Sequence, residues 1–175
     1  MPNRKRAEKW LGNEDTVAFE GRLSRLQWIQ AKYPAISLQL FPGGLLSKYL
    51  FEEARYCFVY GQFLATVMLA LAFVERVLAA DLYGGGLEAA KKDRFQRLLE
   101  HHLERNTITA EEFAQIECAR RNRNAVVHLR PPGHKQTLEC RAFEEDSFPY
   151  HVLESDARNL LALVLRLIAS WPFSV

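Results

Sequence analysis

The chain of 175 residues has the length of one ordinary domain, and 49% of its residues are hydrophobic, which is enough to fill a core. Its 23 basic and 21 acidic residues give a formal net charge of +2. The net charge of the whole molecule is therefore too small to attract a polyanion, and any such binding must come from local clusters of basic residues. Its three cysteines, Cys57, Cys118 and Cys140, are widely spaced, which argues against a disulfide framework or a zinc site and favours a cytoplasmic protein with reduced thiols.

Apolar residues at helical spacing predict the first elements of the chain. Residues 14–32 form a helix that Pro34 ends, and this helix with its extension makes up an N-terminal part, residues 1–45. A long helix is expected from about 47 to 83. The three glycines at 84–86 close it, because glycine readily adopts the left-handed conformation of a helix end.

The middle of the chain predicts two further helices. Residues 87–104 place leucines along one side. Thr109 and Glu112 then have the spacing of a capping box, in which each side chain satisfies a backbone donor at a helix start. That helix runs to about Leu129, because the Pro-Pro-Gly sequence at 131–133 cannot continue it.

The last predicted helix is preceded by an ambiguous segment. Residues 135–152 are expected to form a loop with at most a short hairpin. Ser155 caps the final helix, and Pro172 ends it. We therefore expect one all-α domain over residues 1–175, an antiparallel bundle of four to five helices with its core bundle at 46–171.

One apolar segment leaves two interpretations open. Residues 56–74 are uncharged, and their 19 positions approach the roughly 20 needed to span a bilayer. Gly61, Gln62 and Thr66 in its first half argue against a membrane span, and the alanines of the second half suit close packing in protein. The alternative is a central helix buried on most faces. We expect no membrane association and no signal peptide.

The stretch RRNRNAVVHLRPPGH, residues 120–134, concentrates groups that suit phosphate chemistry. Arginine donates two parallel hydrogen bonds to phosphate oxygens, and histidine exchanges protons near neutral pH. No acidic residue follows until Glu139. Arginines also favour the negative end of a helix, and a histidine beside prolines is often a capping or packing residue, so structural roles are the alternative. The cluster contains Arg120, Arg121, Arg123 and Arg130.

Helical geometry separates two members of this cluster. At roughly 100° per residue, Arg121, Asn124 and His128 fall within about 60° of one another. Arg123 lies roughly 140° from His128, so a regular helix keeps these two side chains apart unless its end unwinds or the long guanidinium reaches back.

The sequence RNAVVH, Arg123 to His128, resembles the Arg-x4-6-His signature of HEPN domains, and Arg121 fits the longer spacing of that signature. Its context is also similar, because the motif closes a late helix and an apolar helix with an internal acid precedes it. The resemblance covers roughly residues 47–171. It implies a HEPN-type bundle that forms a homodimer with two facing motifs.

HEPN domains include many metal-independent endoribonucleases of toxin-antitoxin and phage-defence systems, so the resemblance implies an RNA substrate, no cofactor and an antitoxin or defence-complex partner. It assigns the scissile phosphate to Arg123, acid-base chemistry to His128 and substrate positioning to Asn124. Attack by the ribose 2′-hydroxyl restricts cleavage to RNA. Supporting roles fall to Glu75 and Arg121, and RNA binding to Arg120 and Arg130.

Two alternatives accompany this hypothesis. A HEPN-like module that binds RNA, a nucleotide or a protein without cutting also needs phosphate affinity. Glu75 is either the acid that pairs with the motif arginine or an exposed charge at the end of the apolar stretch. One HEPN subgroup carries a tyrosine two residues after the motif histidine, where adenylylation silences it. Arg130 stands at that position here, which argues against this form of control.

Overall fold

The computed structural model describes residues 3–32 and 41–170. Within these ranges it contains no strand, which confirms the all-α class, but its seven α-helices exceed the predicted four or five. The elements are α1 (Arg4–Lys32), α2 (Gly44–Val59), α3 (Phe63–Gly84), the short 3-10 helix η1 (Glu88–Lys91), α4 (Phe95–Glu104), α5 (Ala110–Val127), α6 (Leu138–Glu144) and α7 (Pro149–Ser170).

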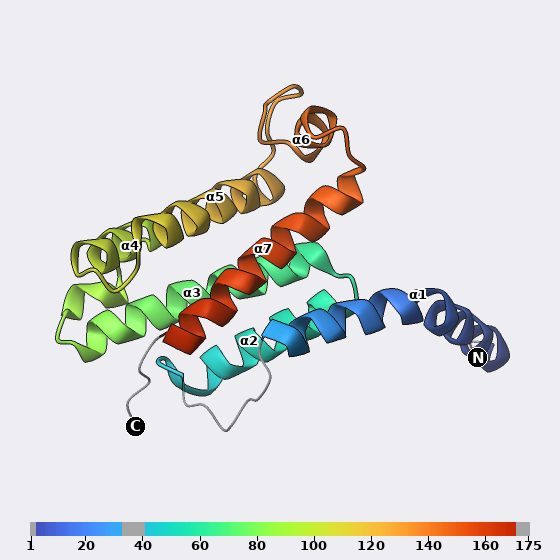
Figure 1. The fold of residues 1–175 in the computed structure, drawn as a ribbon, viewed down its shortest axis with the longest axis horizontal. Helices are drawn as coiled ribbons and strands as arrows, with labels where there is room; N and C mark the ends of the chain where they lie inside the picture. The colour runs from blue at the N-terminus through green and yellow to red at the C-terminus, as the bar shows by residue number, and fades with distance from the viewer. Residues whose placement is uncertain (1–2, 33–40, 171–175) are drawn as a thin grey trace.

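Helix α3 is the centre of the core, and α7 crosses it (Figure 1). It contacts α2, α4, α5 and α7, so apolar residues on most of its faces are buried, which explains why its sequence is apolar nearly all round. Helix α3 is also long and apolar enough to cross a membrane, which is weak evidence by itself. Half of the most apolar 18-residue segment of α3 is buried inside the structure, as in a core helix.

The prediction of one helix over 47–83 was wrong. The chain turns at residues 60–62, and α2 and α3 pack side by side as a helical hairpin. Gly61 makes this turn with φ of 74°, a left-handed conformation that glycine adopts without a steric penalty. A Cβ atom at Gly61 would lie 2.9 Å from the hydroxyl of Tyr150. The apolar run 56–74 is therefore divided between two helices.

The helix expected at 87–104 is also divided, into η1 and α4. The next prediction is confirmed, because Thr109 and Glu112 form the capping box at the start of α5. The Glu112 backbone N–H donates to Thr109 Oγ1 at 3.1 Å, and the Thr109 N–H donates to Glu112 Oε2 at 2.8 Å. Helix α5 ends at Val127, two residues before the predicted end.

Residues 135–152 are more helical than the sequence predicted. They contain α6, which Thr137 caps, and the first turn of α7. Helix α7 begins at Pro149 rather than after Ser155, because a proline at the first helical position lacks only an N–H that would be unpaired there. The predicted helix ends at Pro34 and Pro172 lie outside the described residues.

His101 and His102 are adjacent on α4, and both are at least partly buried. His102 is 0% exposed between α4 and α3. Its Nε2 donates to the Leu78 carbonyl at 3.0 Å, and its Nδ1 lies 2.7 Å from Thr107 Oγ1. Burial lowers the pKa of His102, because the charged imidazolium loses its hydration.

Candidate functional site

A cavity of about 970 Å³ lies where the start of α3, the end of α5, the following loop, α6 and the start of α7 come together. Most of its wall is aliphatic. Residues from four of these segments provide this surface, among them Leu64, Val67, Met68, Val126, Leu129 and Leu153. Leu129 is 100% exposed, so an apolar edge of this cavity is open to solvent.

Two of the predicted arginines line this cavity without an acidic partner. Arg123 comes from the last turns of α5 and Arg130 from the loop that follows. Both are partly buried, and the Nε atom of each is buried without a hydrogen-bond partner. Within the described ranges neither arginine forms an ion pair. Each guanidinium therefore retains hydrogen-bond donors for a ligand.

A third arginine in the cavity wall already has an acidic partner. Arg141 of α6 donates to both carboxylate oxygens of Asp156 on α7, each at 2.7 Å. The Asn122 side chain of α5 also donates to Asp156, at 3.3 Å. Asp156 therefore links α5, α6 and α7 on the polar side of the cavity and fixes their relative positions.

Arg120 and Arg121 both lie close to Glu117, an acidic residue one helical turn before them. Arg120 Nε donates to Glu117 Oε2 at 2.8 Å, and Arg121 Nε lies 3.9 Å from Glu117 Oε1. The sequence interpretation considered only acidic residues that follow the arginine cluster, so it missed Glu117. Glu117 precedes Arg120 by three residues and Arg121 by four, the spacings at which side chains on a helix are neighbours. Of the two motif candidates, Arg123 is thus the one with free donors and cavity contact.

His128 and Asn124 lie outside this cavity wall. His128 is the residue at which α5 ends, and its backbone N–H donates to the Asn124 carbonyl at 2.9 Å. Its side chain is exposed rather than buried among aliphatic residues. A single chain therefore brings Arg123 and Arg130 to one cavity and leaves His128 on the surface at the end of the same helix.

Glu75 faces a different part of the molecule. It lines a second cavity of about 570 Å³, together with Arg76 and Lys91. Arg76 donates from Nε to the Gly43 carbonyl at 3.1 Å, whereas Glu75 forms no ion pair with any residue that the structure describes. One chain does not bring Glu75 and the motif arginine into the same cavity.

The sequence interpretation missed Asn122, Arg141 and Asp156, because they come from three helices and form no local motif. Among the described residues no three His, Cys, Asp or Glu side chains are grouped so that they could hold a metal ion. Comparison with known proteins adds no relative, since no family model, curated protein or solved structure matches this chain.

Proposed function

We propose that the protein is a metal-independent endoribonuclease of the HEPN type, acting on RNA in the cytoplasm. The observation that carries this proposal is the free Arg123 guanidinium on a cavity wall, on the same helix end as the exposed His128. A phosphodiester bound to Arg123 and Arg130 would replace the missing acidic partner with two charge-assisted hydrogen bonds.

The chemistry assigned to these groups is phosphoryl transfer within RNA. The ribose 2′-oxygen attacks the adjacent phosphorus, a base accepts the 2′-hydroxyl proton, and the 5′-oxygen leaves with a proton. The products are a 2′,3′-cyclic phosphate and a 5′-hydroxyl end. His128 is the proposed proton carrier, because imidazole exchanges protons near neutral pH. Asn124 is the proposed positioning group beside it.

The exposure of His128 fits a site that two copies of the chain complete. In this proposal the ends of two α5 helices face one another in a homodimer, so that each phosphate meets donors and a histidine at one crevice. An antitoxin or defence-complex protein is the proposed cellular partner.

A second candidate function is supported by a specific observation. His128 is not part of the wall that Arg123 and Arg130 share, so the cavity by itself binds an anion without a proton carrier. A module that binds RNA or a nucleotide without cutting would need nothing more.

One experiment separates these candidates. Purified protein is incubated with total RNA in EDTA, beside His128→Ala and a matched His151→Ala control, since His151 is also exposed but lies on α7. The nuclease proposal predicts cleavage by the wild type and by His151→Ala. It also predicts a loss of at least about a hundredfold in His128→Ala, the usual contribution of a positioned general acid or base.

Intact RNA together with Arg123-dependent binding, measured by fluorescence anisotropy, would instead support the binding module. Equal cleavage by His128→Ala and the wild type would contradict the assigned site, and RNA that is neither bound nor cut would remove both candidates.

A further inference from the structure

The cavity that Arg123 and Arg130 line is larger and more apolar than a phosphate group requires. Its volume of about 970 Å³ is that of a site for a whole small molecule. Leu64, Val126 and Leu153 bring aliphatic side chains to it from three helices, and none of the described residues in its wall is aromatic. Proteins bind unpaired RNA bases by stacking them on aromatic rings, so this wall suits a saturated chain better than a base.

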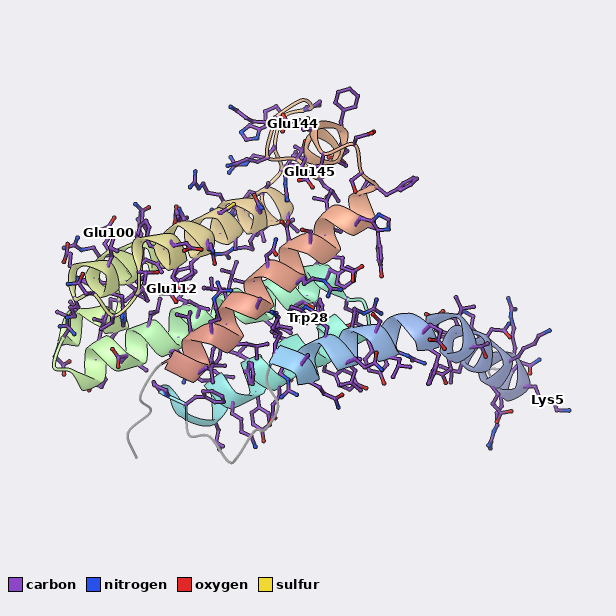
Figure 2. All side chains as sticks on the ribbon, in the orientation of Figure 1. Lys5, Trp28, Glu100, Glu112, Glu144 and Glu145 are labelled. Carbon is purple, nitrogen blue, oxygen red and sulfur yellow. The ribbon has the colours of Figure 1, made fainter. Side chains whose placement is uncertain are left out.

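The acidic residues near the cavity leave its two free arginines unneutralised. Figure 1 shows α6 at the end of α5 and the start of α7, and Figure 2 labels Glu144 and Glu145 at the C-terminal end of α6. Neither of these two acids belongs to the wall. The acids of the wall are Asp156, which already pairs with α6, and Glu139, which is exposed. The two free arginines and Glu139 together leave one positive charge in excess, which matches a monoanion.

The polar groups of the wall offer little to a peptide backbone. Asn122, Arg141 and Asp156 are hydrogen-bonded to one another. The side chain of Thr137 accepts a backbone N–H at the start of α6. Amide groups that are buried without hydrogen bonds are costly, whereas a hydrocarbon chain carries none. The wall therefore favours a ligand with one anionic end and an aliphatic chain.

We propose that this cavity binds a single-chain aliphatic carboxylate of the fatty acid class. The carboxylate accepts hydrogen bonds from Arg123 and Arg130, whose buried Nε atoms have no partner within the chain, and the hydrocarbon chain lies against the aliphatic wall. The inference goes beyond the proposed function. Such a ligand would compete with RNA for the two guanidinium groups, but its binding requires neither a nucleotide nor His128.

Isothermal titration calorimetry of the full chain at pH 7.5, without RNA, tests this assignment with octanoate, decanoate and 1-octanol. We expect one decanoate per chain. Decanoate should bind roughly tenfold more tightly than octanoate, because two further methylenes are buried. The neutral 1-octanol has the same chain length as octanoate but no charge for the arginines, so it should bind at least about tenfold more weakly than octanoate.

Two matched pairs of variants locate the ligand. Arg123→Gln should weaken decanoate binding at least about tenfold, whereas Arg121→Gln, an exposed position outside the wall, should leave it unchanged. Val126→Gln should also weaken binding, because Val126 lines the cavity. Its neighbour Val127 is equally exposed, 48% against 49%, but lies outside the wall, so Val127→Gln is the control. Circular dichroism checks that each variant keeps its helices.

The proposal would be overturned if decanoate did not bind, if it bound no more tightly than octanoate, or if wall and control variants lost equal affinity. Tighter binding of acetylated trileucine with a free carboxylate would also overturn it, in favour of a peptide ligand. No RNA is present in these titrations. A failure of RNA cleavage would therefore remove the proposed nuclease and leave this inference standing.

Discussion

Arg141 and Asp156 form two parallel hydrogen bonds between α6 and α7, Nη1 to Oδ2 and Nη2 to Oδ1, each 2.7 Å long. The hydrogen bonds that Arg141 donates to Asp156 raise the pKa of Arg141, so the arginine is held in its charged form. Both side chains are largely shielded from solvent. This pair is the connection that closes the polar side of the large cavity.

Replacing Asp156 by asparagine should destabilise the protein, because the Arg141 side chain, which is only 17% exposed, then loses its charged partner. We expect the free energy of unfolding to fall by about 1–3 kcal/mol, the usual contribution of hydrogen bonds to charged groups. Urea unfolding followed by circular dichroism measures the change. Glu144→Gln on the outer side of α6 is the matched control and should stay within about 0.5 kcal/mol of the wild type. An equal effect of both changes would contradict this role of Asp156.

Arg130→Ala should weaken RNA binding in a salt-dependent manner, because the variant loses one guanidinium with a free Nε in the cavity wall. The slope of log affinity against log salt concentration should decrease by about 0.7 for a single-stranded RNA. Fluorescence anisotropy at several salt concentrations measures this slope. Arg121→Ala removes an exposed arginine that lies 3.9 Å from Glu117 and outside the cavity wall, and we expect a smaller effect from it. A larger effect at Arg121 would locate the interface elsewhere.

The stability of the protein should decrease as the pH falls below about 6.5, the ordinary pKa of an unfolded histidine. Burial lowers the pKa of His102, so on acidification the unfolded chain binds this proton before the folded chain does. The resulting stability loss is at most about 1.4 kcal/mol per pH unit.

Urea unfolding between pH 5 and 8 tests this dependence. His102→Gln should be less stable than the wild type at pH 8 and should lose this part of the pH dependence. His151→Gln, at an exposed position, should retain it. Identical pH profiles for wild type and His102→Gln would show that another group is responsible.

Gly61→Ala should destabilise the turn between α2 and α3 by at least about 1 kcal/mol, because alanine disfavours positive φ. The added Cβ atom would also lie too close to the Tyr150 hydroxyl. Gly84 at the end of α3 is the control, since its φ is not positive and a Cβ atom there meets nothing within 4 Å. Thermal unfolding should show a lower midpoint for Gly61→Ala and an unchanged or higher one for Gly84→Ala. A neutral Gly61→Ala would contradict the requirement for glycine.

The sequence by itself determined features that depend on neighbours three or four positions apart. The helical class, the capping box of Thr109 and Glu112, and the end of α5 to within two residues all follow from periodicity and local chemistry. The pairing of Arg120 with Glu117 has the same local origin and was open to prediction. A helix repeats every 3.6 residues, so such relationships are fixed before the helix packs against anything.

Only the tertiary structure decided which of these residues share a site. Asn122 and Asp156 are 34 positions apart, and Leu78 and His102 are 24 apart, yet each pair is in hydrogen-bond contact. Such contacts depend on the angle and distance at which whole helices pack, and no local period encodes these quantities. For the same reason, the sequence left open whether Glu75 pairs with the motif arginine, and in the single chain the packing of α3 places it at another cavity.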